Sequence, residues 1–520
     1  MKHILLIMTD QQRGDYVGYL PNGKAVMPHL DTVAASAHFT HCNTVNPICT
    51  PARTALITGR YSRQIGTLTM AGDLFPQIPT FMQALQRAGY TTYGIGKFHY
   101  LQTWPWSVPR GCGSDLVQNT EDMKAFGYDY IWETSGKQQL VKNYCHYCHY
   151  LNQKGMLDAV RDFSLACGGG NGDTADHNYD KALPWAFEEA DYIDVVTGRV
   201  AREQLARHPA DRPFFMKVSF CGPHKPYDAP QRYLDQFPLE TKDDFILPDG
   251  QRLTDAERQA IYRQRRSVQA MLKLIDDQIG EIFDLLRARG MFDDTLILFT
   301  SDHGDMLGDH YMIQKGVPWR QACEVPLAIR LPHAAPVGRC EAPVELTDLT
   351  ATILDYAGLD PQEALSRSWP AYNDRIPARS LLPILRGEID SVRDYCYLES
   401  DFTEERAAGT DLSEVIRKRG AGRTNAWRAI VTRESKYIRY VDYAAPGQAH
   451  EEFYDLTVDP NECVNRIGEQ AYAGAVQTAR DRMLYVVDRY PAAQLTWAKV
   501  NASARRVNPP QTDYREEYTR

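Results

Sequence analysis

Four short apolar runs, each followed directly by a polar cluster, constrain the fold of this chain more than any other feature. They span residues 3–9, 91–96, 213–219 and 295–300. Each run has the length of a buried strand, and segments with helical periodicity lie between them. Alternating strands and helices are typical of a mainly parallel, doubly wound sheet with helices on its faces. In such a sheet the polar clusters meet at the carboxyl edge, where ligands bind.

The second half of the chain changes character after a turn-rich stretch at residues 370–383. Before it, helical patterns cover residues 78–88, 192–207, 255–289 and 344–357, the last ending at Gly358. After it, short strands are predicted at residues 395–398, 429–432, 437–441 and 452–456, and a helix at residues 472–490. We therefore expect an α/β domain at residues 1–375 and a smaller α+β subdomain with a short antiparallel sheet at residues 376–520. A polar tail follows Pro491.

Charge and hydropathy exclude two classes of partner. The 520-residue chain has a formal net charge of −9, and its basic residues are dispersed rather than gathered in a stripe. That pattern is not the electrostatic footprint of a nucleic-acid-binding protein. The first apolar run is too short for a signal peptide, and no later run is long enough to span a bilayer. The sequence therefore predicts no nucleic-acid partner, no membrane partner and a cytoplasmic location, and it does not indicate an oligomeric state.

The eleven cysteines are more typical of reduced thiols than of a disulfide framework, because their number is odd and no export signal is seen. Cys145 and Cys148 form a C-x-x-C pair, which can begin a zinc site. A structural zinc site needs a second pair of ligands, and only the isolated Cys167 follows. Buried or loop thiols are therefore the favoured interpretation, and the role of Cys145 and Cys148 stays open.

Between residues 100 and 180 the regular alternation breaks down, and aromatic residues are interleaved with glycine and polar residues. They are Trp104, Trp106, Tyr128, Tyr130, Trp132, Tyr144, Tyr147 and Tyr150. Long irregular segments on a rigid scaffold often shape binding sites, and aromatic faces suit sugar rings. Packing in the hydrophobic core is the alternative explanation of the same residues.

Two polar pairs follow the first and the last apolar run. Asp10 and Gln11 offer two oxygen donors, and Asp302 and His303 offer a carboxylate and an imidazole. Together these residues would hold one divalent cation, which would act on a sulfate or phosphate oxygen as a Lewis acid. Taken singly, Asp10 could cap a turn and Asp302 could belong to an ordinary strand-to-loop transition. Their shared position after strands favours the metal site.

Cys49 is the candidate nucleophile. A thiolate is a strong nucleophile but pairs poorly with a hard, oxygen-bound metal, which favours an oxygen nucleophile on a modified residue. Thr50 and Pro51 are expected to begin a helix whose N-terminal amides favour an anion beside residue 49. Arg53, one turn further on, can point to the same place, a surface salt bridge being the alternative.

Four further cationic or titratable residues are candidates because they follow strand-like runs. They are Lys97, His99, His224 and Lys315. The two lysines could hold a tetrahedral anion, and His224 could protonate a leaving oxygen because imidazole titrates near neutral pH. Each of them, taken alone, could equally be a solvated lysine or a loop histidine.

Six separated stretches share their pattern with one known family. They are Thr9–Arg13, Cys49–Arg53 with Leu56–Arg60, Gly96–His99, Pro223–Tyr227, Ser301–Gly308 with Gln314–Gly316, and Phe453–Glu462. In this order they resemble the formylglycine-dependent sulfatases of the alkaline-phosphatase superfamily, over most of the chain. The resemblance implies an alkaline-phosphatase-like fold in which residues 1–375 are the catalytic domain. It also implies that a maturase oxidises Cys49 to formylglycine.

The resemblance implies a reaction in two halves. The formylglycine hydrate at residue 49 attacks the sulfur of a sulfate ester, while the metal, Arg53, Lys97 and Lys315 stabilise charge. His224 then protonates the departing alcohol, and His99 assists when the second hydroxyl expels sulfate. Asp10, Gln11, Asp302 and His303 bind the metal together with the modified residue 49. The substrate is a small-molecule or saccharide sulfate ester, and the aromatic segment favours a saccharide.

Two departures from the family pattern keep alternatives open. Many sulfatases place an aspartate where Gln11 stands and an asparagine where His303 stands. Calcium is the expected metal and manganese the alternative, because manganese accepts imidazole readily. Phosphonate monoester and phosphodiester hydrolases of the same superfamily carry a similar Asp-Gln and Asp-His arrangement, so they are the alternative activity. A protein that binds sulfated ligands without turnover is the alternative outside enzymes.

Overall fold

The computed structural model describes most of the chain. The described residues are 2–68, 70, 73–101, 110–168, 181–239, 241–242, 244–248, 252–366, 375–401, 426–441 and 449–493. Trp104 and Trp106, part of the turn-rich stretch at residues 370–383, and the tail after residue 493 lie outside the described residues. No helix among the described residues has both the length and the apolar character needed to cross a bilayer.

An eight-stranded, mainly parallel sheet forms the centre of the molecule, in the order β4-β3-β5-β1-β6-β7-β2-β8. Its strands are β1 (His3–Asp10), β2 (Ala37–Asn43), β3 (Thr91–Lys97), β4 (Tyr130–Thr134), β5 (Phe214–Pro223), β6 (Thr295–Ser301), β7 (Leu327–Arg330) and β8 (Gly338–Glu345). β1 runs parallel to β5 and β6, and only β7 among these strands runs antiparallel to its neighbours. The predicted fold class and the four predicted strands are confirmed.

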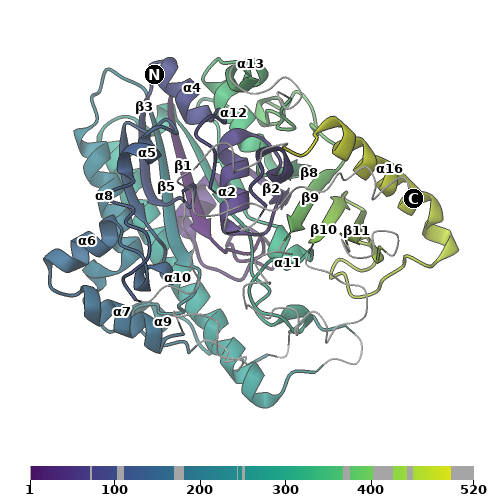
Figure 1. Cartoon of the computed structure of the whole chain (residues 1–520), viewed down its shortest axis with the longest axis horizontal. Coiled ribbons are helices and arrows are strands. Elements are labelled where there is room, and N and C mark those ends of the chain that lie inside the picture. The colour runs from purple at the N-terminus through teal and green to yellow at the C-terminus, as the bar shows by residue number, and fades with distance from the viewer. Residues whose placement is uncertain are drawn as a thin grey trace.

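Helices cover both faces of this sheet (Figure 1). They are α1 (Pro28–Ala34), α2 (Cys49–Thr58), α3 (Ser62–Ile65), α4 (Phe81–Arg87), α5 (Thr120–Lys124), α6 (His146–Gln153), α7 (Leu157–Ala166), α8 (Ile193–Arg207), α9 (Gln231–Leu234), α10 (Asp255–Ala288), α11 (Arg320–Cys323), α12 (Asp348–Tyr356), α13 (Pro361–Ser366) and α14 (Leu382–Leu385). Because side chains alternate along β1, Leu5 and Ile7 pack with α8 and α10, whereas Ile4 and Leu6 pack with α2, α4 and α12. The sheet therefore has a separate core on each face.

The predicted start of the helix at residues 344–357 was wrong. Val344 and Glu345 belong to β8, where they pair with Cys42 and Asn43 of β2. Helix α12 begins only at Asp348, whose carboxylate accepts the backbone N–H of Glu345 at 2.8 Å. When an apolar run continues from a strand into a helix, the spacing of its apolar residues does not show where the strand ends and the helix begins. The predicted helix at residues 78–88 likewise begins later, at Phe81, where the Thr80 side chain caps it.

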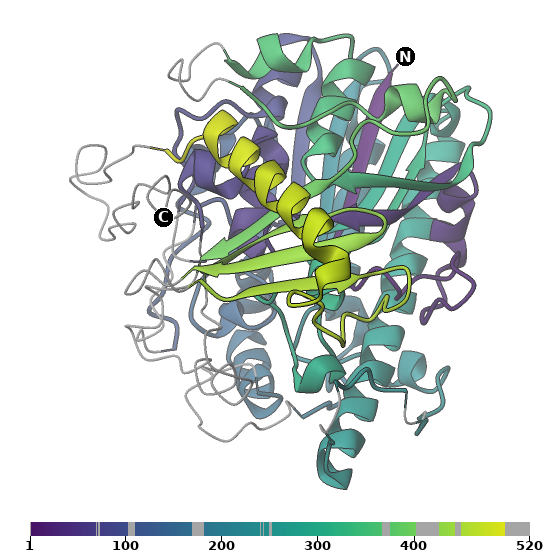
Figure 2. The same cartoon turned by 90° about the vertical axis from the view of Figure 1, so that its right-hand side faces the viewer.

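A second, four-stranded antiparallel sheet follows in the chain, in the order β12-β11-β10-β9. It contains β9 (Cys396–Asp401), β10 (Ala426–Val431), β11 (Ser435–Val441) and β12 (Glu451–Asp455). Helix α16 (Ala473–Arg489) lies across one face of it, where Val476 and Met483 pack against Ile430 and Tyr437 (Figure 2). The predicted small sheet with a packed helix is confirmed. The boundary after residue 375 stays a prediction.

The second sheet also supports the loop that follows β6. The Trp427 indole N–H donates to the carbonyl of Gly316 at 3.2 Å, one residue beyond Lys315. Farther along the chain, the Glu462 carboxylate accepts a hydrogen bond from the Arg320 backbone N–H at 3.0 Å. Glu462 also forms an ion pair with Lys436, and the side chains of Glu462 and Lys436 are both buried. The position of Lys315 therefore depends on both sheets.

Candidate active site

The predicted site residues meet at the carboxyl edge of the large sheet. Asp10 and Lys97 are the last residues of β1 and β3, His224 follows β5, and Asp302 follows β6. These four strands are neighbours in the sheet, so residues far apart in sequence lie at adjacent strand ends. Cys49 is the first residue of α2, which packs on one face of the same sheet.

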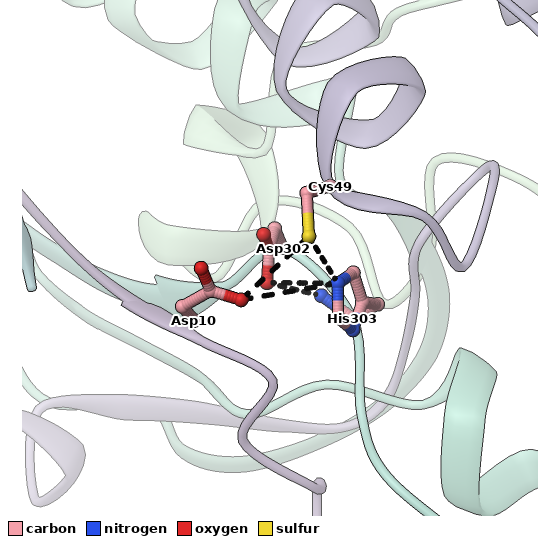
Figure 3. A group of neighbouring side chains, drawn as sticks. All are labelled: Asp10, Cys49, Asp302 and His303. Carbon is pink, nitrogen blue, oxygen red and sulfur yellow. Dashed lines mark hydrogen bonds and ion pairs between the residues drawn. The ribbon is translucent and has the colours of Figure 1, made fainter. Parts of the chain in front are cut away.

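Four side chains form a buried group that suits a metal ion (Figure 3). Potential ligand atoms of Asp10, Cys49, Asp302 and His303 all lie within 4.8 Å of one another. The Cys49 Sγ is 3.1 Å from His303 Nε2 and 3.8 Å from Asp10 Oδ1. His303 Nδ1 donates to the Gly304 carbonyl at 3.0 Å, which turns Nε2 toward the group. Two carboxylates and one imidazole fit a divalent cation.

Gln11 lies beside this group but is engaged by other residues. Its backbone N–H donates to Asp302 Oδ1 at 3.0 Å, and its side-chain nitrogen donates to the Asp305 carboxylate. Its side-chain oxygen accepts from Lys315 Nζ at 2.5 Å. With φ of 69°, Gln11 adopts the left-handed conformation that turns the chain at the strand end. Its predicted role as a metal ligand stays a prediction.

Arg53 is fully buried and joins both carboxylates, so the alternative of a surface salt bridge is wrong. Its Nε donates to Asp302 Oδ2 at 2.7 Å, and one terminal nitrogen lies 3.5 Å from Asp10. The other terminal nitrogen donates to the Lys97 carbonyl at 2.6 Å and to Ser219 Oγ at 2.8 Å. Burial raises the pKa of Asp302, but Arg53, His303 and Lys97 together hold that pKa below its usual value.

Lys97 supplies a second buried positive charge. Its Nζ is ion-paired with Asp10 and lies 3.8 Å from Cys49 Sγ. Burial opposes ionisation of Asp10, yet the charges of Lys97, Arg53 and Lys315 hold its pKa well below the usual range. Burial and Asp10 likewise oppose a thiolate at Cys49, but Lys315, Lys97 and His303 lower its pKa overall. The surroundings of residue 49 therefore favour a negatively charged atom.

The start of α2 strengthens this preference. The residue before Cys49, Ile48, is extended and offers no side-chain cap, and the first turn of the helix contains Pro51. The N–H groups of a first helical turn lack partners within the helix and attract anions. The predicted helix start beside residue 49 is confirmed.

The two histidines predicted for proton transfer are both buried, with distinct partners. His224 Nδ1 donates to the Lys225 carbonyl at 2.7 Å; burial, and then the charge of Lys315, hold its pKa well below the usual value. His99 Nε2 lies 3.3 Å from the Ser135 carbonyl, and its Nδ1 has no hydrogen-bond partner among the described residues. Burial and Lys97 lower the pKa of His99 as well. Both rings are therefore neutral at neutral pH in the free site.

Two residues that support the site were missed by the sequence reasoning. Ser219, which holds Arg53, is the last residue of a predicted strand, and Asp305, which holds Gln11, lies within the Ser301–Gly308 stretch. Asp305 also accepts from the Tyr227 hydroxyl at 3.2 Å. Position at a strand end was the available signal for Ser219.

The described aromatic residues of the 100–180 segment belong largely to the core. Tyr128 and Tyr147 are almost completely buried, and Trp132 of β4 retains only 9% of its exposure. Core packing therefore accounts for these three rings. Cys145 and Cys148 are buried thiols, and no group of metal ligands among the described residues includes them.

The chain resembles known proteins over nearly its whole length. Residues 2–359 match the family model described as Sulfatase. An arylsulfatase of Clostridium perfringens is 26% identical over 498 residues, covering 92% of each chain. An N-acetylglucosamine-6-O-sulfatase of Bacteroides thetaiotaomicron is 24% identical, covering 91% of this chain and 83% of the relative. The solved phosphonate monoester hydrolase of Agrobacterium radiobacter superposes with a TM-score of 0.72 at 22% identity, over 94% of this chain and 96% of that one.

Replacing one carboxylate of the ligand group tests whether the group binds a metal. In Asp302→Asn we expect the affinity for Ca²⁺ and Mn²⁺ to fall by at least about tenfold, because a charged ligand is lost and Arg53 is left unbalanced. Calorimetric titration of chelator-treated protein measures this affinity. Asp293→Asn, at a side chain that is 84% exposed, is the matched control and should leave it unchanged. Equal affinities in the two variants would place the metal elsewhere.

Proposed function

The chain belongs to the sulfatase family of sulfuric ester hydrolases, and on that premise we propose that it hydrolyses a saccharide sulfate ester with a formylglycine hydrate made from Cys49 as the nucleophile. The observation that supports this most is the position of residue 49. It is buried at the start of α2, in contact with His303 and close to Asp10 and Lys97. A nucleophile held there faces a metal-binding group on one side and cationic side chains on the other.

The modification at Cys49 is part of the proposal, and the sulfur atom in the structure stands in for the nucleophilic oxygen. A thiolate would be a soft donor among the oxygen donors of Asp10 and Asp302, which hard cations prefer. An oxygen at the same place matches them. The Cys49–Arg53 stretch carries the processing signal, and a maturase is the partner that must supply the aldehyde.

Asp10, Asp302 and His303, with residue 49 and Gln11, would hold one divalent cation. When bound, the cation neutralises charge on a sulfate oxygen and favours the deprotonated nucleophile. Calcium is the metal we expect, and manganese is the alternative because His303 supplies an imidazole nitrogen.

The cationic side chains around residue 49 stabilise the transferring sulfuryl group. Arg53 and Lys97 are already paired with Asp302 and Asp10, so their main effect is to keep both carboxylates ionised and in place. Lys315 is the half-buried member, and its Nζ donates to the uncharged side-chain oxygen of Gln11. Lys315 is therefore best placed to hold an incoming sulfate oxygen.

The two histidines divide the proton transfers. As the oxygen at residue 49 bonds to sulfur, the bond from sulfur to the substrate oxygen breaks, and His224 gives that oxygen a proton. A bound sulfate ester brings a negative charge that offsets Lys315, so it raises the pKa of His224 and allows the ring to carry the proton. In the second half, His99 accepts the proton of the remaining hydroxyl through its free Nδ1, sulfate departs and the aldehyde is restored.

The saccharide part of the proposal rests on the relative that is named for an N-acetylglucosamine-6-sulfate ester. The aromatic segment adds little support, because its described rings lie mainly in the core. Phosphonate monoester hydrolysis is the second candidate, favoured by Gln11 and His303.

A comparison of substrates tests the reaction class. With one metal-loaded preparation, we expect kcat/KM for an aryl sulfate and for glucosamine 6-sulfate to exceed that for an aryl phosphonate monoester with the same phenol. Cys49→Ala should lower every rate by about 10⁴-fold or more, because it removes the nucleophile. Faster turnover of the phosphonate or of a phosphodiester than of every sulfate tested would overturn the sulfatase assignment of this site.

Substitution of His224 tests its role as the acid. In His224→Gln we expect kcat/KM for a sugar sulfate to fall by about 10²–10⁴-fold, because an alkoxide leaves poorly without a proton. An aryl sulfate with an acidic phenol should lose far less. His333→Gln, at a side chain that is 70% exposed, is the control. Equal losses on both esters would show that His224 does not protonate the leaving group.

A further inference from the structure

A pair of buried cysteines beside the active site has no part in sulfate ester hydrolysis. Cys145 immediately precedes α6, and Cys148 lies in the first turn of that helix. Their sulfur atoms are 3.4 Å apart, within hydrogen-bond distance of each other. Both side chains are fully buried. A C-x-x-C pair with this placement brings two sulfur atoms to one helix N-terminus, where a thiolate is stabilised.

The surroundings make the two thiols unequal. Burial raises the pKa of Cys145, but the Cys148 thiol, the Cys148 backbone N–H and the backbone and hydroxyl of Ser135 together lower it below that of a free thiol. The Ser135 hydroxyl lies 3.7 Å from the Cys145 sulfur. The hydrogen bond to Cys145, followed by burial, raises the pKa of Cys148 well above the usual value. Cys145 is therefore the thiolate and Cys148 the thiol.

A buried carboxyl group, that of Glu133, lies close enough to Cys145 to interact with its charge. The Glu133 side chain is 1% exposed, and neither carboxylate oxygen has a partner in hydrogen-bond geometry among the described residues. Burial, and then the charge of Cys145, raise its pKa well above the usual value, and the His99 backbone N–H opposes this rise only in part. A buried carboxyl group without a partner is costly unless it stays protonated.

We propose that Cys145 and Cys148 form an oxidisable dithiol, which hydrogen peroxide converts to a disulfide and a thiol reductant restores. The Cys145 thiolate attacks one peroxide oxygen, the O–O bond breaks, and the departing hydroxide takes the Glu133 proton to become water. The Cys148 sulfur then attacks the Cys145 sulfenic acid, and the hydroxide that leaves takes the Cys148 proton. The sum is one disulfide, one Glu133 carboxylate and two waters from one peroxide.

The burial of both sulfurs determines the kind of oxidant. Helix α6 lies at the left margin of the molecule in Figure 1, and its His149 and Gln153 side chains are exposed. Both sulfurs belong to α6 and the residue before it, and the outer face of this helix is exposed. Hydrogen peroxide is close to water in size and can reach them through local opening of that helix, whereas bulky disulfide reagents are excluded.

Oxidation should also reach the sulfatase site through the segment between β4 and α6. Ser135, whose hydroxyl faces Cys145, presents its carbonyl to His99 Nε2 at 3.3 Å. Its neighbour Gly136 lies against Lys97, since a Cβ added there would be 3.2 Å from Lys97 Cε. The disulfide removes the thiolate that accepts from Ser135. We expect the contact of the Ser135 carbonyl with His99 to change when the disulfide forms, and kcat to fall as a result. This coupling rests on the proposed function, whereas the dithiol does not.

Peptide mass spectrometry of the peroxide-treated enzyme tests the dithiol. Trypsin releases residues 143–154, which contain Cys145 and Cys148 as their only cysteines. We expect this peptide to lose two hydrogen atoms in mass at least about tenfold faster than the exposed Cys112 is oxidised, because Cys145 is a thiolate. Dithiothreitol should reverse the change. An unaltered peptide after complete oxidation of Cys112 would overturn the proposal.

Two variants separate the steps. In Cys148→Ser, oxidation should stop at a Cys145 sulfenic acid, which dimedone traps when the protein is unfolded in its presence, and an absence of this adduct would contradict Cys145 as the attacking sulfur. In Glu133→Gln, the disulfide should form at least about tenfold more slowly, because the proton donor is lost. An unchanged rate of disulfide formation would show that Glu133 does not donate this proton.

Turnover of an aryl sulfate tests the coupling. We expect peroxide to lower the kcat of the wild-type enzyme by about fivefold, reversibly, through the altered contact of His99. The double variant Cys145→Ser/Cys148→Ser should keep its kcat under the same treatment. A disulfide without a change in kcat would contradict the coupling alone. A reduced enzyme that turns over no sulfate ester would contradict the proposed function and leave the dithiol intact.

Discussion

The buried guanidinium of Arg53 is the interaction on which the rest of the site depends. From the first turns of α2 it contacts residues of three strands and the residue after a fourth: Asp10 of β1, the carbonyl of Lys97 in β3, Ser219 within β5, and Asp302 directly after β6. Two carboxylates buried without a cation would be costly, and removal of one partner from such a pair typically costs about 3–5 kcal/mol. Arg53 therefore holds the catalytic edge together and keeps both carboxylates charged for a metal.

The same arrangement explains why residue 49 is suited to negative charge. Arg53 and Lys97 offset Asp302 and Asp10, which leaves Lys315 and the N-terminus of α2 to attract an anion. Lys315 and this helix N-terminus then balance the charge of the substrate and of the nucleophile, and Trp427 of the second sheet supports the loop of Lys315. The described residues of the C-terminal part of the chain thus support the site without entering it.

Much of this site could be predicted from the sequence because apolar strands and the polar residues at their ends are both visible in it. Asp10, Lys97, His224 and Asp302 were identified in this way, and their convergence is confirmed by the order of β1, β3, β5 and β6. The sequence did not show which residues distant from one another in the chain come into contact. The burial of Arg53 depends on Ser219 and Asp302, which lie far from it in the chain, and the strand at Val344 was hidden because its pairing with β2 leaves no local signal. The aromatic rings were ambiguous for the same reason, since only packing tells a core ring from a binding surface.

The chemical state of residue 49 tests the central claim most directly. After co-expression with a formylglycine-generating maturase, the peptide that contains Cys49 should have exchanged its sulfur and two hydrogens for one oxygen. The converted fraction should rise in proportion to sulfate ester turnover across preparations. Preparations that turn over sulfate esters while retaining only intact cysteine at residue 49 would contradict the account.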